Sequence, residues 1–207
     1  MLCPVRRGRL LPYKPSMAGT MIPLNSLTQQ SLFALLYKID LDMAEQTRSR
    51  RCPFCGGPLY YANYQRKPRG GPADLQEVFE ICFSLCCGNE GCRCRTKPPS
   101  VRFWGRRVYW APVLLLVTAL RQGRNPDVTL EQIKGFCGPW RSTVNRWREH
   151  FRLIFSQSSQ YQRLSAHLRL RPGGNCVLYD VLEQFCQAAQ TPGEALINCL
   201  RYLLVES

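Results

Sequence analysis

The spacing of apolar positions changes several times along the chain, and each change predicts a different kind of element. Residues 1–25 show no regular spacing, which predicts a flexible leader. From residue 26 to 37 the spacing is helical, and Ser26 or Thr28 can cap the helix. Its apolar face needs a surface to pack against, either the cysteine-rich segment that follows or a partner subunit. That face consists of Leu32, Leu35, Leu36 and Ile39.

An alternating pattern follows, which is typical of strands with one buried face. Residues 59–64 are rich in tyrosine, and residues 78–86 carry a large apolar side chain at every second position. The segment 66–72 between them is basic and contains prolines and glycines, so it is expected to form a loop. Together these segments predict an antiparallel hairpin. The face expected to be buried carries Phe79, Ile81, Phe83 and Leu85.

Close groups of cysteines lie before and after this hairpin. The string Cys52-Pro-Phe-Cys-Gly-Gly precedes it, and a cysteine-rich segment at 86–94 follows it. Two short turns that each present two thiolates supply the tetrahedral ligand set that Zn²⁺ prefers. The spacing therefore predicts a zinc ribbon with a structural zinc ion. The predicted ligands are Cys52, Cys55, Cys87 and Cys92.

Strand parity and turn geometry select the second pair of ligands. Cys87 has the parity of the buried positions of its strand, whereas Cys86 points to the other face. Glycines between Cys87 and Cys92 permit a tight turn. Two alternatives stay open, with Cys86 in place of Cys87 or Cys94 in place of Cys92.

The segment 96–110 interleaves aromatic residues with Arg102, Arg106 and Arg107. Arginine side chains form paired hydrogen bonds with phosphate oxygens, so this segment can lie along a nucleic-acid backbone. In the alternative interpretation it is a linker whose aromatic side chains pack on the ribbon. Both interpretations stay open at this point.

Helical spacing dominates the second half of the chain. We predict an apolar helix at 112–122, a short helix at 130–137, and a third helix at 141–155 after the break at Gly138-Pro139. Short helices with a glycine turn before the last one are typical of a helix-turn-helix. The inward stripe of the third helix is expected to contain Val144, Trp147, Phe151 and Ile154.

The outward face of that third helix carries the candidate DNA contacts. The string Ser142-Thr-Val-Asn-Arg-Trp147 resembles the recognition helices of bacterial helix-turn-helix proteins, although Lys134 stands where such motifs place a small residue. Arginine can read guanine and asparagine can read adenine in the major groove. An arginine-rich, solvated helix without a DNA partner is the alternative. The predicted contacts are Arg141, Ser142, Thr143, Asn145, Arg146 and Arg148, together with Arg106 and Arg107.

Further helices are expected after residue 157, with apolar stripes suited to packing or to formation of a homodimer. The predicted fold is therefore mainly α with a small β zinc ribbon, a helix-turn-helix bundle and additional C-terminal helices. The predicted domains are a flexible leader at 1–25, an N-terminal helix with the zinc ribbon at 26–110, the helix-turn-helix at 111–156, and the C-terminal helices at 157–207.

Charge is distributed unevenly over the 207 residues, which carry a net charge of +14. Residues 48–110 hold 12 basic and 4 acidic side chains, and residues 121–171 hold 10 and 3, whereas residues 172–207 hold 1 and 4. This clustering favours a polyanionic partner, and we expect double-stranded DNA. No apolar run reaches the length of a membrane span. The close cysteine spacing is typical of metal knuckles rather than disulfides, so we expect the protein in the reducing cytoplasm. With DNA as its partner, it would be associated with the nucleoid.

The sequence lacks the usual signatures of catalysis. The acidic residues are scattered and do not predict the converging carboxylates of a metal-dependent nuclease. No pair of histidines at ligand spacing, glycine-rich phosphate loop or nucleophile elbow occurs in it. We therefore do not expect this chain to be an enzyme by itself.

Three strings together resemble a group of bacterial proteins. They are Cys52-Pro-Phe-Cys-Gly-Gly, Arg66-Lys-Pro-Arg-Gly-Gly-Pro and Cys92-Arg-Cys-Arg-Thr-Lys-Pro-Pro-Ser-Val-Arg-Phe-Trp-Gly-Arg-Arg-Val-Tyr. Across residues 45–155 the chain is similar to transposase-like proteins that combine a zinc ribbon with a helix-turn-helix. The resemblance implies a four-cysteine zinc site, DNA contact through residues 142–148 and an association with mobile elements.

These observations predict a zinc-stabilised, sequence-specific DNA-binding protein. It would act as a transposon accessory factor or a transcriptional regulator, and it would lack a catalytic domain. The alternatives are a protein–protein adaptor and a non-catalytic DNA-binding subunit of a recombinase or transposase complex. In the latter case a separate chain supplies the chemistry.

Overall fold

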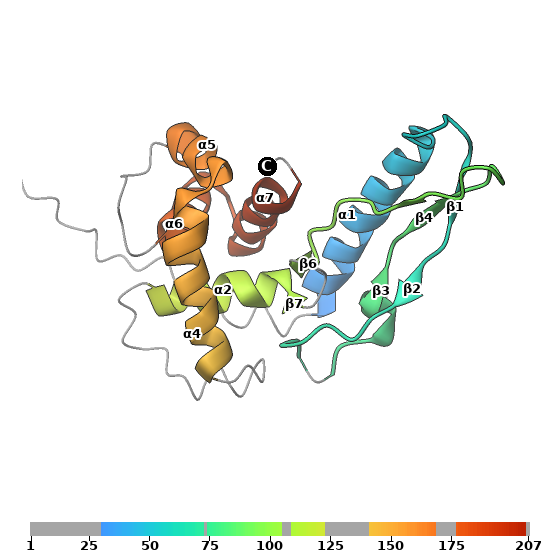
Figure 1. Ribbon diagram of the computed structural model, residues 1–207. Coiled ribbons are helices and arrows are strands. Elements are labelled where there is room, and N and C mark those ends of the chain that lie inside the picture. The colour runs from blue at the N-terminus through green and yellow to red at the C-terminus, as the bar shows by residue number, and fades with distance from the viewer. Residues whose placement is uncertain (1–29, 73, 105–108, 123–140, 169–176, 206–207) are drawn as a thin grey trace, which may run out of the picture.

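The computed structural model of the protein describes residues 30–72, 74–104, 109–122, 141–168 and 177–205. Within these ranges, six α-helices and short antiparallel strands form two regions that lie side by side (Figure 1). The ribbon region contains the first helix and the strands up to residue 96. The helical region begins at residue 111. The mainly helical fold with small antiparallel sheets agrees with the predicted fold class.

Helix α1 (Gln30–Ser49) is longer than the predicted helix. It continues past residue 37 because Asp40 and Ala44 extend its buried face by successive turns. Leu35 was expected on that face, but it is 47% exposed, and Phe33 is buried instead. The proposed caps at residues 26 and 28 lie outside the described residues.

The predicted hairpin is present, but each of its strands is broken in two. At the breaks, the side chain of Asn63 takes the place of a backbone acceptor in the strand pairing. The Ser84 N–H donates to Asn63 Oδ1 at 3.2 Å. The predicted strand at 78–86 also begins as a turn of 3-10 helix, η2 (Glu77–Glu80). The strands are β1 (Leu59–Tyr61), β2 (Tyr64–Gln65), β3 (Ile81–Cys82), β4 (Leu85–Cys87) and β5 (Arg95–Thr96).

Two antiparallel sheets result from these breaks. Strands β1, β4 and β5 form a three-stranded sheet with β4 in the middle, and β2 pairs with β3. Near the break both faces are covered, since Cys82 and Ser84 are buried together with Phe83. The predicted alternation of buried and exposed positions is therefore correct at Leu85 and Cys87 but wrong at residues 82 and 84.

A second, smaller hairpin joins the two regions. Strand β6 (Phe103–Trp104) pairs with β7 (Tyr109–Trp110), and residues 105–108 lie outside the described ranges. The ring of Trp110 meets that of Phe33 in α1 at a centroid distance of 5.1 Å. On the other side, the Trp104 and Tyr109 rings meet those of Phe151 and Trp147 at 5.3 and 5.1 Å. The aromatic residues of segment 96–110 therefore have a packing role, as in the linker interpretation, but among these rings only Trp110 packs on the ribbon region, whereas Trp104 and Tyr109 pack on the helical region.

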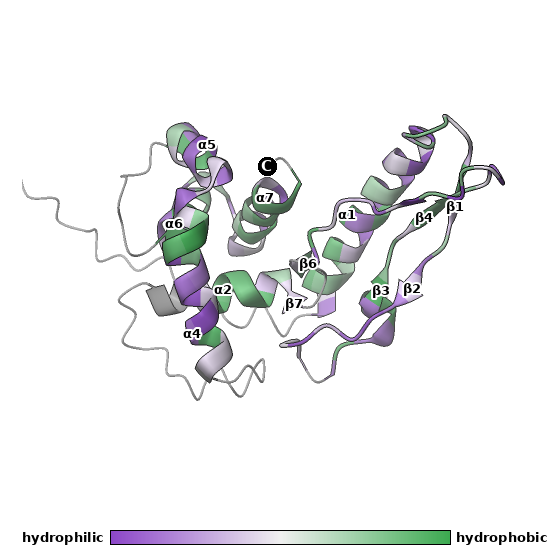
Figure 2. Ribbon diagram, in the orientation of Figure 1, coloured by the Kyte–Doolittle hydropathy of each residue, from purple (hydrophilic) through white to green (hydrophobic). Residues whose placement is uncertain are grey.

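Helix α2 (Ala111–Gln122) is the centre of the helical region. Its described side chains, residues 111–119, are all buried, and its apolar colouring stands out in Figure 2. It contacts α4, α6 and α7. These helices are α4 (Arg141–Glu149), α5 (Ser159–Leu168), α6 (Val177–Ala188) and α7 (Pro192–Leu204). The predicted helix at 130–137 lies outside the described residues, so the helix-turn-helix arrangement stays a prediction.

The helical run that begins with α4 changes its geometry before it ends. After Glu149 it forms a π-helical turn, η3 (His150–Ile154), and then a 3-10 turn, η4 (Phe155–Gln157). Ile154 was predicted on the buried stripe, but it is 63% exposed, whereas Phe155 is 5% exposed. A π turn contains more residues than an α turn, so the buried position moves one residue along the chain.

Helix α7 begins directly after a capping residue. The side chain of Thr191 accepts a hydrogen bond from the Glu194 N–H at 3.2 Å, and Pro192 occupies the first turn. Cys199 on this helix is buried and packs in the main core. Within the described residues, no helix is both long enough and apolar enough to cross a membrane.

Candidate metal centre and basic surfaces

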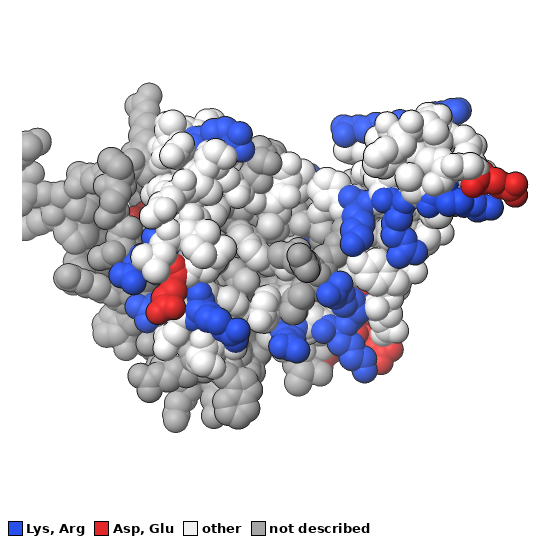
Figure 3. Space-filling view, in the orientation of Figure 1, with Lys and Arg blue, Asp and Glu red and all other residues white. Residues whose placement is uncertain are grey.

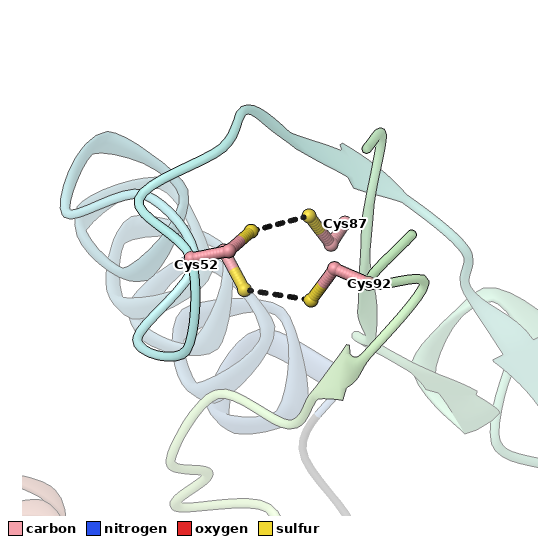
Figure 4. Close-up of side chains that lie close together, drawn as sticks. Cys52, Cys87 and Cys92 are labelled. Atoms are coloured by element: carbon pink, nitrogen blue, oxygen red, sulfur yellow. Dashed lines mark hydrogen bonds between the residues drawn. The ribbon is translucent and has the colours of Figure 1, made fainter. Parts of the chain in front are cut away.

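Four cysteine sulfur atoms converge at the end of the ribbon farthest from the helical region (Figures 1 and 4). They belong to Cys52, Cys55, Cys87 and Cys92, and all lie within 4.8 Å of one another. The Sγ atoms of Cys52 and Cys92 are 3.8 Å apart, and those of Cys55 and Cys87 are 3.4 Å apart. A tetrahedral zinc ion with Zn–S bonds of about 2.3 Å requires sulfur atoms about 3.8 Å apart. The predicted residues therefore form a group that could hold a metal ion.

The two alternative ligands do not join this group. Cys86 points away, and its thiol lies 3.6 Å from the carbonyl oxygen of Arg93. Cys94 packs beside the group, and its carbonyl oxygen accepts a hydrogen bond from the Cys87 N–H at 2.9 Å. The parity argument is right for Cys87, which is fully buried.

The first knuckle is held by hydrogen bonds across its turn. The Gly56 N–H donates to the Cys52 carbonyl at 2.8 Å, and the Cys52 N–H donates to the Gly57 carbonyl at 2.9 Å. Gly56 adopts a φ of +70°, a conformation that favours glycine. A Cβ atom on Gly57 would lie 2.6 Å from the side-chain nitrogen of Asn89. That nitrogen donates to the Cys55 sulfur at 3.4 Å, so the second knuckle supports a ligand of the first.

The second knuckle is fixed both internally and against the first. The Cys92 N–H donates to the Asn89 carbonyl at 3.0 Å and closes the turn. The Gly88 N–H donates to the Pro58 carbonyl at 2.9 Å, which ties the second knuckle to the strand that leaves the first. The protein backbone therefore brings both pairs of thiols together.

Local hydrogen bonds and burial shift the pKa values of the Cys55, Cys87 and Cys92 thiols in different directions. A backbone hydrogen bond from Gly57, assisted by the Cys87 thiol, lowers the pKa of Cys55 to about 7. The pKa of Cys87 is raised overall. A backbone hydrogen bond at Asn89 acts to lower this pKa, but burial and the neighbouring thiols outweigh it. The backbone at Cys94 acts in the same way on Cys92, whose pKa is also raised for the same reasons. Because metal ligands must be thiolates, binding of a cation here releases protons.

The cysteine group sits in a very small apolar core. Its buried members are Cys52, Leu59, Leu85 and Cys87, and they form a cluster separate from the main core. So small a core contributes little stability by itself. Four thiolates with no carboxylate or imidazole suit Zn²⁺, and they would leave no open position for a reacting water molecule.

Arg102 does not have the phosphate-binding role that one of the two interpretations of segment 96–110 gave it. Its side chain is fully buried, and its Nε donates to Asp40 Oδ2 at 2.7 Å. The two terminal nitrogens donate to the carbonyl oxygens of Phe79 and Ile81 at 2.6 and 2.8 Å. A ligand cannot reach this guanidinium, because it is fully buried and all three of its nitrogens donate to groups inside the protein.

Asp40 is the partner that sequence reasoning missed. Besides Arg102, its carboxylate accepts from the Ser100 hydroxyl at 2.5 Å and from the Val101 N–H at 2.7 Å. Burial raises the pKa of Asp40, and the Arg102 charge offsets part of that rise. The Arg102 guanidinium also lies 4.8 Å from the ring centroid of Tyr37. This ion pair therefore joins α1 to the chain that leads into the small hairpin.

The basic loop at 66–72 docks on the small hairpin. The Trp110 N–H donates to the Arg69 carbonyl at 3.4 Å. Gly71 lies directly on the indole, because a Cβ atom there would be 2.4 Å from Trp110 Nε1. Lys67 and Arg69 are exposed, so the loop presents its charges beside the hairpin.

Helix α4 presents most of the predicted DNA contacts to solvent. Val144 and Trp147 are buried, as predicted, and Thr143 is half-buried. The exposed side chains are Ser142, Asn145, Arg146 and Arg148. The side chain of Arg141 and all of Arg106 and Arg107 lie outside the described residues. Figure 3 shows basic side chains near α4 and along the ribbon on the same face of the molecule.

Comparison with family models, with curated proteins and with solved structures finds no match to this chain.

Proposed function

We propose that this protein is a zinc-stabilised, sequence-specific DNA-binding protein without a catalytic domain of its own. It acts either as a transposon accessory factor or as a transcriptional regulator. Double-stranded DNA is its partner, and the outward face of α4 is the observation that carries this proposal. A net charge of +14 provides the long-range attraction.

Helix α4 is suited to reading base edges. Its inward side is held by Val144 and by Trp147, whose ring meets that of Tyr109 in the small hairpin. The outward side offers Asn145 and Arg146, side chains that form bidentate hydrogen bonds with adenine and guanine. In this proposal α4 enters the major groove.

Basic segments beside α4 contact the phosphate backbone in this proposal. In the sequence, Arg106 and Arg107 come between β6 and β7 of the small hairpin, whose aromatic rings contact α4 and η3. The loop carrying Lys67 and Arg69 docks on the same hairpin. The zinc ion is structural here, since it holds the ribbon from which this loop extends.

Binding to random duplex DNA followed by sequencing of the bound fraction tests the proposal. The enriched duplex and a scrambled duplex are then compared by fluorescence anisotropy over a range of salt concentrations. Affinity for both should fall steeply with salt, because counterions are released from the DNA. Arg146→Ala should remove about 1–3 kcal/mol of the preference for the enriched duplex.

Arg201→Ala is the matched control, because Arg201 is an exposed arginine on α7, in the acidic C-terminal part of the chain. It should change neither the affinity nor the preference. Absence of salt-sensitive duplex binding in the zinc-loaded protein would overturn the proposal.

A second candidate function is a DNA-binding subunit or adaptor that docks on a separate recombinase or transposase chain. It is favoured by two exposed apolar side chains in the π turn, Leu153 and Ile154, which are 49% and 63% exposed. A partner that remains bound after nuclease treatment, and that is lost on Ile154→Asp, would support this function. Enrichment of no partner under these conditions would exclude it.

A further inference from the structure

The outer face of the three-stranded ribbon sheet lies opposite the metal group. Tyr60 pairs with Cys86, and Cys86 pairs with Arg95, so these residues form one row across β1, β4 and β5. Cross-strand neighbours project from the same face of a sheet. Their sequence neighbours Leu59 and Cys87 project from the other face, into the small core. The row therefore faces away from the metal ligands.

Tyr60 is an exposed aromatic side chain on this face. Its ring is 61% exposed, yet it rests on the second knuckle, because a Cβ atom on Gly88 would lie 2.4 Å from its Cε2 atom. The neighbouring Tyr61 has a different role, since its hydroxyl donates to Glu45 of α1 at 2.7 Å. A ring already held against the backbone loses little freedom when another flat group stacks on it.

A stripe of cations lies along β5, the edge strand on the other side of β4 from Tyr60. Arg93, Arg95 and Lys97 are exposed, and the residues between them are half-buried. Arg95 lies on β5, whereas Arg93 precedes the strand at a φ of +46° and Lys97 follows it. The Arg95 guanidinium lies 6.0 Å from the ring centroid of Tyr64. Glu90 is the acidic neighbour, and its contact with Arg93 is a loose, solvent-exposed pair at 3.9 Å. The stripe therefore keeps a strong positive potential.

We propose that this outer face binds single-stranded DNA, with an unpaired base stacked on Tyr60 and phosphates along the Arg93–Lys97 stripe. An exposed aromatic ring beside a row of cations is the combination that single strands recognise, because stacking needs a free base face. Paired bases in a duplex are already stacked and do not offer that face. The inference rests on the proposed nucleic-acid function. It concerns the ribbon sheet and single-stranded DNA, whereas α4 is proposed to bind duplex DNA.

Abasic DNA separates stacking from charge. The zinc-loaded full-length protein is titrated against a short labelled oligo(dT) and against a strand of equal length and charge that lacks bases. We expect oligo(dT) to bind about tenfold more tightly, because each stacked base is worth about 1–3 kcal/mol. Tyr60→Leu should abolish this difference, and Tyr60→Phe should retain it. The zinc content of each variant shows whether the ribbon is intact.

The charge stripe has its own pair of variants. Arg95→Gln should weaken binding of oligo(dT) and of the abasic strand by the same factor, and it should lower the salt dependence of both. Arg201→Gln, on the exposed surface of α7, should change neither.

Three results would overturn the inference. They are equal affinity of the wild type for oligo(dT) and the abasic strand, a preference for oligo(dT) that persists in Tyr60→Leu, and no binding to either strand. The enriched duplex distinguishes these failures from a failure of the proposed function. Duplex binding without oligo(dT) preference rejects only the single-strand site, whereas oligo(dT) preference without duplex binding rejects only the reading role of α4.

Discussion

The ribbon region and the helical region differ in what holds them together. Around its knuckles the ribbon has a small cluster of apolar side chains, of which half are cysteines. The helical region surrounds α2 with large side chains from α4, α6 and α7. Burial of apolar area stabilises the second region, whereas a metal ion held by the four thiols would stabilise the knuckles of the first. The two regions should therefore respond differently to the same change.

Metal removal should give the largest difference between the regions. Cys87→Ser should prevent stoichiometric zinc binding and unfold the knuckles, since structural zinc contributes about 10–16 kcal/mol of apparent binding energy in small zinc modules. Zinc analysis and limited proteolysis measure this effect, with early cleavage expected in residues 52–94. Cleavage in α6 and α7 should be unchanged.

The adjacent Cys86 provides the matched control for that variant. Cys86→Ser removes a thiol from the same strand but not from the metal group, so zinc content and protease resistance should stay at wild-type values. Equal loss of zinc in both variants would contradict the ligand set.

The buried ion pair that joins α1 to the chain before the small hairpin should give the next largest effect. Asp40→Asn leaves the Arg102 charge buried without compensation, so the free energy of unfolding should fall by about 3–5 kcal/mol. Urea titration followed by tryptophan fluorescence measures the change. Replacing both partners with apolar residues, as in Asp40→Leu with Arg102→Met, should recover much of the loss. A cost below 1 kcal/mol for Asp40→Asn would contradict a structural role for the pair.

The π turn offers a comparison inside the helical region. Phe155→Ala should cost about 3–5 kcal/mol, because Phe155 is buried against Phe151 and Tyr161. Ile154→Ala should change stability by no more than about 0.5 kcal/mol, because Ile154 is exposed. Thermal or urea unfolding of both variants checks the difference. A larger loss of stability for Ile154→Ala than for Phe155→Ala would contradict the π turn and favour the regular α-helical stripe predicted from the sequence.

The smallest effect is expected at the start of α7. Thr191→Ala removes the hydrogen bond that caps the Glu194 N–H and should lower the free energy of unfolding by about 1 kcal/mol. Thr191→Ser keeps the hydroxyl oxygen and should stay close to the wild type. Hydrogen exchange of the first-turn amides localises the effect, and unchanged exchange in Thr191→Ala would exclude a capping role.

The sequence predicts the metal group better than any other part of the molecule. Cysteine spacing limited the candidates, and strand parity distinguished Cys87 from Cys86 because β4 stays regular over those residues. Local rules fail where a single side chain interrupts the pattern. Asn63 accepts a hydrogen bond from the Ser84 N–H and interrupts both strands. The alternation of apolar and polar residues in the sequence gives no sign of this hydrogen bond.

Long-range partners were the harder problem. Arg102 looks like a surface cation in a basic segment, and its partner Asp40 is 62 residues away in the chain. One signal for the pair was present, since Asp40 lies four residues after Leu36 on the buried face of α1, where a lone carboxylate needs a cation. The π turn left no comparable signal, because Ile154 and Phe155 are both apolar and fit helical spacing equally well.

X-ray absorption at the zinc edge of the purified protein tests the metal-dependent ribbon most directly. Four sulfur neighbours at about 2.3 Å, and no nitrogen or oxygen neighbour, are the predicted result. A protein purified without zinc that cannot be loaded with it, or a zinc ion bound by oxygen or nitrogen atoms, would contradict it.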